Sequence, residues 1–197
     1  MVLNPKNNQY LVVLAIALFM VSACSVEVRR KAEQLGEHPQ SIFTDIRIDL
    51  CEKFIDENDP NSIPHQICPG ISGYKLMVRH VGAGRQSIDV ITPSNEAFPL
   101  NLQDFFGRNM YHLGRKVEWR ALNKDGMRNP FALIVEVQVH GDMEAPQRVT
   151  QSFFALSKIT PNEICVTHRV PANDLSHAQL WELADRSVRM DCQKATP

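Results

Sequence analysis

The sequence predicts an α+β fold: a meandering antiparallel sheet, a C-terminal helix and two disulfides. Strand-like alternation of apolar and polar residues recurs between residues 74 and 170. Turn-rich segments such as "NKDGMRNP" and "TPN" separate these stretches. One helical pattern then follows near the end of the chain. Strands followed by a helix, without regular β-α alternation, are typical of the α+β class.

The first half of the domain predicts a hairpin between two less regular segments. "SIFTDIRIDLCEKFI" fits both helical and strand spacing, and we expect a turn or short helix that leads into a strand around Cys51. "GYKLMVRHV" and "SIDVI" flank the turn "VGAGRQ", which predicts the hairpin. "PSNEAFPLNLQDFFGRNMYHLG" predicts a loop with one helical turn.

The second half predicts four strands and the helix. In "KVEWRAL" the alternation directs Val117, Trp119 and Ala121 inward and Lys116, Glu118 and Arg120 outward. "FALIVEVQVH" is the most apolar strand, with Phe131, Leu133, Val135, Val137 and Val139 on one side. "VTQSFFALSKI" and "EICVTHRV" follow as two further strands. In the helix, Asn173 or Asp174 is the expected cap, and the apolar stripe comprises Ala178, Leu180, Trp181, Ala184 and Val188.

The N-terminus predicts an export signal. A polar start containing Lys6 precedes a run of 14 apolar or small residues, 10–23, that ends at Cys24. A membrane-spanning helix needs about 20 such residues, whereas this length and the small residues at its end are typical of a signal peptide. The run as an uncleaved anchor is an alternative. "VSAC" also resembles the bacterial lipobox, in which the cysteine becomes the acylated N-terminus of a lipoprotein.

We therefore expect a signal peptide over 1–23, a lipidated N-terminus and tether over 24–40, and one α+β domain over 41–197. Lipidation of Cys24 would place the protein in the bacterial cell envelope, anchored to a membrane and facing the periplasm. The alternative is a secreted or soluble periplasmic protein in which Cys24 is removed or has no role.

The cysteine count agrees with this assignment. Five cysteines leave one unpaired, and a lipid on Cys24 leaves four that can pair in three ways. We favour Cys51–Cys68 and Cys165–Cys192 because each bridge joins segments expected to be neighbours. Both bridges need an oxidising compartment.

The sequence predicts no catalytic residue, no metal site and no cofactor. With 21 basic and 22 acidic side chains the net charge is −1, and no basic stripe supports nucleic-acid binding. The seven histidines lack metal-ligand spacing, and no nucleophile-elbow motif occurs. Glu136, Gln138 and His140 share one strand face, which is most simply a solvated one. The aromatic residues of 104–112 are expected in the core, with a ligand or partner groove as the alternative.

The order of several short motifs resembles a family of small exported proteobacterial proteins of uncharacterised function. The motifs are a first cysteine, "CPGISGY", "VEWRAL", "EICVTHRV" and the closing "LADRSVRMDC". The resemblance covers about residues 41–192, with Met190 where an aromatic residue is common in the family. It implies an exported protein with two disulfides, and it implies no catalytic or binding residue.

These observations together predict a non-catalytic binding or inhibitory domain of an envelope lipoprotein. Its expected partners are the membrane, through the N-terminal lipid, and an envelope protein or cell-wall component. The alternatives are a periplasmic enzyme whose site is assembled from distant loops and a structural component of an envelope complex.

Overall fold

The computed structural model describes residues 38–55, 63–82, 84–107, 109–124, 126–141 and 148–194. All of these except His38 belong to one compact unit, Pro39–Pro197. The predicted signal peptide, Cys24 and the tether up to residue 37 lie outside the described residues. The described part contains no helix long and apolar enough to cross a membrane.

The predicted α+β class is confirmed, with strands distributed over two five-stranded antiparallel sheets. The elements are β1 (Gln40–Asp45), η1 (Ile48–Leu50), β2 (Glu52–Phe54), β3 (His65–Pro69), β4 (Lys75–His80), β5 (Gln86–Ile91), β6 (Ala97–Pro99), α2 (Gln103–Phe106), β7 (Met110–Lys124), β8 (Met127–His140), β9 (Val149–Ile159), β10 (Ile164–Pro171), α3 (His177–Arg186) and η2 (Ser187–Arg189). The first sheet has the order β1-β7-β8-β9-β10, and the second has the order β2-β3-β4-β5-β6.

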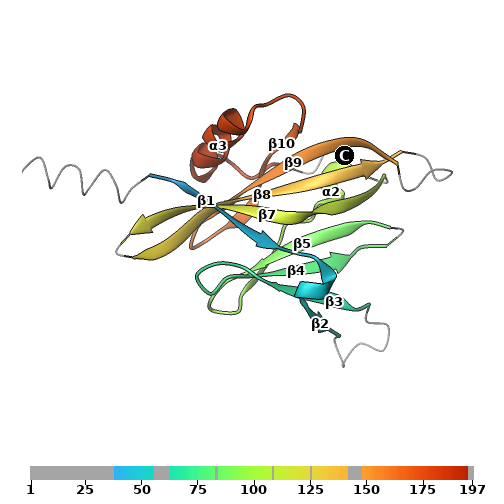
Figure 1. Cartoon of the computed structure of the whole chain (residues 1–197), viewed down its shortest axis with the longest axis horizontal. Coiled ribbons are helices and arrows are strands. Elements are labelled where there is room, and N and C mark those ends of the chain that lie inside the picture. The colour runs from blue at the N-terminus through green and yellow to red at the C-terminus, as the bar shows by residue number, and fades with distance from the viewer. Residues whose placement is uncertain are drawn as a thin grey trace, which may run out of the picture. The chain divides into compact units, whose positions relative to one another are not determined.

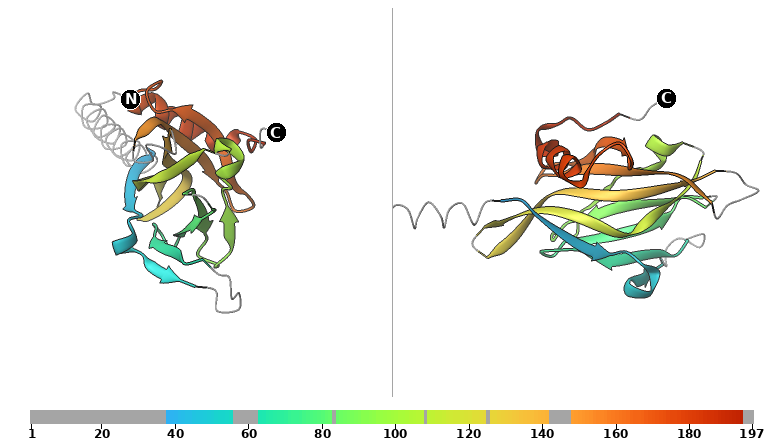
Figure 2. Two further views of the ribbon diagram at one scale, coloured as in Figure 1. Left: turned by 90° about the vertical axis from the view of Figure 1, so that its right-hand side faces the viewer. Right: turned by 45° about the horizontal axis from the view of Figure 1, so that its top comes forward.

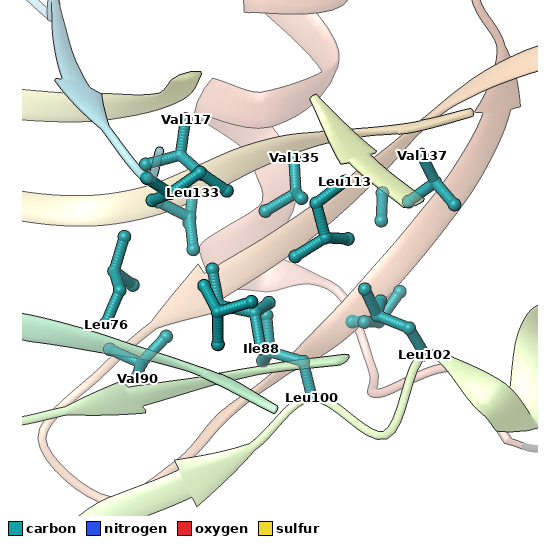
Figure 3. Close-up of a cluster of buried hydrophobic side chains, with 14 of the residues drawn as sticks. Leu76, Ile88, Val90, Leu100, Leu102, Leu113, Val117, Leu133, Val135 and Val137 are labelled. Carbon is teal, nitrogen blue, oxygen red and sulfur yellow. The ribbon is translucent and has the colours of Figure 1, made fainter. Parts of the chain in front are cut away.

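The main core lies between the two sheets. Figure 1 shows the second sheet on one side of the first and α3 on the other. Alternate residues of each strand point into the core, as the two-residue period of a strand requires. Leucine, isoleucine and valine side chains from both sheets meet there (Figure 3), and they include Leu76, Ile88, Val90, Val117, Leu133, Val135 and Val137. Phe106 and Tyr111 belong to the same cluster, which confirms the core interpretation for these two aromatics, and Phe105 packs against the cluster while partly exposed.

A smaller core lies between the outer face of the first sheet and α3; the ribbon of α3 lies over this sheet in Figure 2. Leu180 and Ala184 of the predicted helical stripe are buried against Ala132, Ile134 and Leu156, whereas Ala178 is exposed. Phe131 packs in this cluster and not in the main core, because the β7–β8 register shifts next to it.

The helix begins later than predicted. Ser176, and not Asn173 or Asp174, is the N-cap, because its hydroxyl accepts a hydrogen bond from the Gln179 amide. The Gln179 side chain in turn accepts from the Ser176 amide, which completes a capping box.

Three segments form strands that the sequence does not predict. Residues 65–69 form β3, which pairs with β2 and β4. Residues 40–45 form β1, which pairs with β7 although no local pattern indicates this partner. The expected loop over 93–114 contains β6, α2 and the first residues of β7. The short helix and strand expected around Cys51 are present as η1 and β2.

Candidate functional site

Two of the sequence motifs meet in a buried polar network between β7 and α3. Arg120 donates two hydrogen bonds to the Asp185 carboxylate, at 2.7 and 2.8 Å, and its guanidinium lies over the ring of Trp181. Glu118 accepts a hydrogen bond of 2.6 Å from the indole of Trp181. Ser41 connects the Glu118 and Arg120 interactions, because its hydroxyl donates to Glu118 and accepts from Arg120.

The prediction that Glu118 and Arg120 face solvent is therefore wrong. Both residues are buried, since α3 covers the sheet face on which they lie. A buried ion pair needs its full set of hydrogen bonds to offset the loss of hydration. The "EWR" and "LAD" motifs thus supply the two halves of one helix-to-sheet contact, and their role in the fold is structural.

A third motif, "CPGISGY", contacts the indole of Trp119. This side chain lies on the opposite face of β7 from Glu118 and Arg120 and points into the main core. Trp119 donates a hydrogen bond to the Thr44 hydroxyl at 2.9 Å, and Tyr74 lies 6.1 Å away between ring centroids. At Gly70 an added Cβ would lie 2.6 Å from the Tyr74 carbonyl oxygen and 2.9 Å from the Trp119 ring, so no larger residue fits without movement. The "CPGISGY" segment is therefore shaped around this tryptophan.

The four predicted disulfide cysteines pair as expected. Cys51 bonds to Cys68, and Cys165 bonds to Cys192. Glu163 lies within metal-ligand distance of the second pair. This cluster is not a metal site, because sulfur atoms joined in a disulfide are not thiolates that can bind a metal.

Exposed apolar side chains flank Cys51 of the first disulfide along the chain. We call this surface the apolar edge; it comprises Ile48, Leu50, Phe54, Ile55 and Ile63. Ile48 is 71% exposed, and β2 is the terminal strand of its sheet. An open groove of about 400 Å³ adjoins the edge and is lined by Leu50, Cys68 and Tyr74. The sequence contained the signal, because Ile48 and Leu50 alternate with charged residues, but that alternation equally fits a half-buried strand.

A second groove, of about 290 Å³, opens between the two sheets. We call it the basic groove. Its wall includes buried Ile46, Val78 and Leu113, and its polar lining includes Gln86, His80 and Arg115.

The two sheet histidines closest together are His112 and His140, on β7 and β8. Their ring nitrogens Nδ1 and Nε2 lie 2.9 Å apart, so one ring donates and the other accepts. Burial, followed by the nearby His140 and His80, lowers the pKa of His112. His140 is 8% exposed, so the expectation of a solvated face is wrong for this residue. Glu136 bonds to the Gln138 amide at 3.1 Å on the same face, and neither histidine lines either groove described above.

The sites that sequence reasoning identified are thus the disulfides, whereas the two grooves and the apolar edge emerge only from the structure. A comparison of the chain with models of protein families, with curated proteins and with solved structures found no match.

Proposed function

We propose that this chain is a cell-envelope lipoprotein whose folded domain is a non-catalytic binding module for another envelope protein. The observation behind this proposal is the apolar edge. Exposed apolar side chains are common singly, but a contiguous group beside a groove is typical of an interaction surface. The two disulfides favour an oxidising compartment outside the cytoplasm, and Cys24 in its "VSAC" context supplies the proposed anchor.

The position of the apolar edge indicates how a partner would bind. The edge includes Phe54 of β2, a strand whose one neighbour among the described residues is β3. A terminal strand presents backbone N–H and C=O groups that an extended segment of another protein can pair with. The partner segment would place apolar side chains against Ile48 and Leu50. An extended segment with alternating apolar residues is therefore the expected binding element.

Site-specific photocrosslinking tests the proposal. The full chain would be expressed in bacteria that export it to their envelope, with p-benzoylphenylalanine in place of Ile48. We expect one discrete adduct with another protein, and Leu50→Asp in the same chain should abolish it. A matched control has the probe at Met127, which is also well exposed, at 64%, but lies in the β7–β8 hairpin. No adduct at position 48, or the same adduct from position 127, would contradict the binding role.

Intact-mass analysis of the membrane fraction tests the anchor separately. We expect the mature chain to begin at Cys24 with the added mass of acyl chains. A mature N-terminus beyond Cys24, without lipid, would refute the lipoprotein assignment and leave the crosslinking result to stand alone.

A further inference from the structure

The basic groove has the shape of a small-molecule site. It is bordered by the connection from β1 to η1, by the second sheet and by β7. Its volume of about 290 Å³ is just below the range for drug-sized ligand pockets, which is about 300–1,000 Å³. The buried side chains of Ile46, Val78 and Leu113 form an apolar wall. A ligand that fits must therefore be small and partly apolar.

A β-bulge positions the charged group at this groove. Between Leu113 and Val117 the register of β7 against β8 shifts, so that four steps along β7 match two steps along β8. The bulge places Arg115 outside the regular ladder, and the Arg115 carbonyl accepts a hydrogen bond of 2.9 Å from the Ile46 amide. Bulges of this kind often redirect a side chain next to a functional site.

Gly114 allows the bulge to pack closely. A Cβ at this position would lie 2.8 Å from a carboxylate oxygen of Glu136 and 3.0 Å from the Glu136 Cβ. Glu136 reaches Gly114 from the outer face of the sheet, whereas the groove lies on the inner side. The bulge is thus held by a backbone bond to Ile46, and Gly114 leaves room for the Glu136 side chain beside it.

Hydrogen-bond donors predominate in the groove. The Gln86 side-chain oxygen accepts a bond of 3.0 Å from the Leu113 amide, which leaves the NH₂ group of Gln86 to donate. Arg115 forms no ion pair with any residue that the structure describes, whereas Arg47, also in the lining, is paired with Asp45 at 2.8 Å and with Asp49 at 3.8 Å. No aspartate or glutamate lines the groove within the described residues.

We propose that the basic groove binds a small carboxylate, whose charge lies against Arg115 and whose apolar part contacts Ile46, Val78 and Leu113. A guanidinium can hold a carboxylate through two parallel hydrogen bonds, and the Gln86 NH₂ group supplies a further donor. The carboxylate can belong to the C-terminus of a peptide or to a free short-chain acid. Ile48 of the apolar edge also borders this groove, but the carboxylate site rests on Arg115 and Gln86 and does not depend on the function proposed above.

An NMR titration of the ¹⁵N-labelled full chain in detergent micelles tests the proposal. The probes are N-acetyl-Ala-Ala and butyrate, each compared with its neutral amide. We expect saturable shifts of the Leu113, Gly114 and Val78 amides with at least one carboxylate. The probe that binds more tightly identifies the source, peptide terminus or free acid. The neutral amides should bind at least about tenfold more weakly, because they lack the charge that strengthens a hydrogen bond to arginine.

Two variants test whether carboxylate binding depends on Arg115 in the bulge. Arg115→Ala should weaken binding at least about tenfold, and Arg115→Lys should restore part of it. Lys116→Ala is the matched control, because Lys116 is the adjacent exposed cation and does not line the groove. The proposal is overturned if neither carboxylate gives saturable shifts, if the amides bind equally well, or if Arg115→Ala binds like the unmodified chain.

Discussion

Replacement of Asp185 by alanine should be among the most destabilising single changes in the domain. The Arg120 side chain is only 6% exposed, so water cannot replace the two hydrogen bonds that Asp185 accepts. Removing one partner of a buried ion pair costs about 3–5 kcal/mol, because the other charge stays buried without compensation. Asp185 itself is 28% exposed, and Ser41 still bonds to Arg120, so we expect the lower end, about 3 kcal/mol.

Thermal unfolding of the full chain in mild detergent measures this cost, with the fluorescence of Trp119 and Trp181 as the probe. For a domain of this size 1 kcal/mol corresponds to a shift in Tm of about 2–4 °C, so Asp185→Ala should lower Tm by roughly 6–12 °C. Glu182→Ala is the control, since Glu182 lies one helical turn from its partner Arg186 and both are well exposed. That change should cost less than about 0.5 kcal/mol.

A double variant keeps the test decisive if Asp185→Ala fails to fold. Arg120→Met combined with Asp185→Leu removes both partners of the ion pair and should be more stable than Asp185→Ala alone, because the Arg120 guanidinium no longer stays buried without its carboxylate. The reasoning is refuted if Asp185→Ala unfolds within 2 °C of the unmodified chain, roughly the scale of a surface change. It is also refuted if the double variant is less stable than the single one.

Three further predictions concern stability. Tyr111→Phe should raise the free energy of unfolding, measured by denaturant titration, by about 1 kcal/mol. The Tyr111 hydroxyl is fully buried without a hydrogen-bond partner among the described residues, and burial raises its pKa to about 12. A loss of stability in this variant would show that the hydroxyl is hydrogen-bonded. Burial lowers the pKa of His65, His112 and His168, so the native state binds protons less readily than the unfolded chain, whose histidines titrate near about 6.5. Stability should therefore fall as pH drops below about 6.5, and His112→Gln should reduce the difference in Tm between pH 7.5 and 5.5; an unchanged difference would contradict the assignment. Reduction of the disulfides should lower the free energy of unfolding by about 3 kcal/mol for each loop, and a Tm that does not respond to reductant would argue against a structural role for them.

The sequence predicts the strands and the helix better than it predicts which sheet faces are covered. The alternation in "KVEWRAL" identified the strand, but alternation alone cannot show whether a polar face is solvated or covered. Charged residues are seldom fully buried, so the sequence alone predicts that Glu118 and Arg120 are exposed to solvent. The helix supplies a partner for each: Trp181 for Glu118 and Asp185 for Arg120. Only the tertiary structure brings these residues together.

The candidate sites also depend on tertiary contacts that local sequence patterns do not show. Pairing of the cysteines was predictable because each bridge joins adjacent segments. The β1 strand was not, because its partner β7 is more than 70 residues away in the chain. The basic groove depends on the bulge at Gly114 and Arg115, whose only sequence signal is a glycine and two basic residues within a strand pattern.

The contact between β7 and α3 also constrains the order in which the chain can fold. During synthesis the N-terminal part emerges first, so β7 is complete well before residues 177–186 are available. Until then Glu118 and Arg120 lie on a sheet face that also exposes Ile134 and Leu156, and the acceptor Asp185 is missing. A nascent chain at this stage has an unfinished, partly apolar surface of the kind that associates non-specifically or recruits chaperones. The outer face of the first sheet is therefore covered only when α3 packs on it, and we expect a chain interrupted before residue 177 to be a substrate for degradation and not a smaller stable domain.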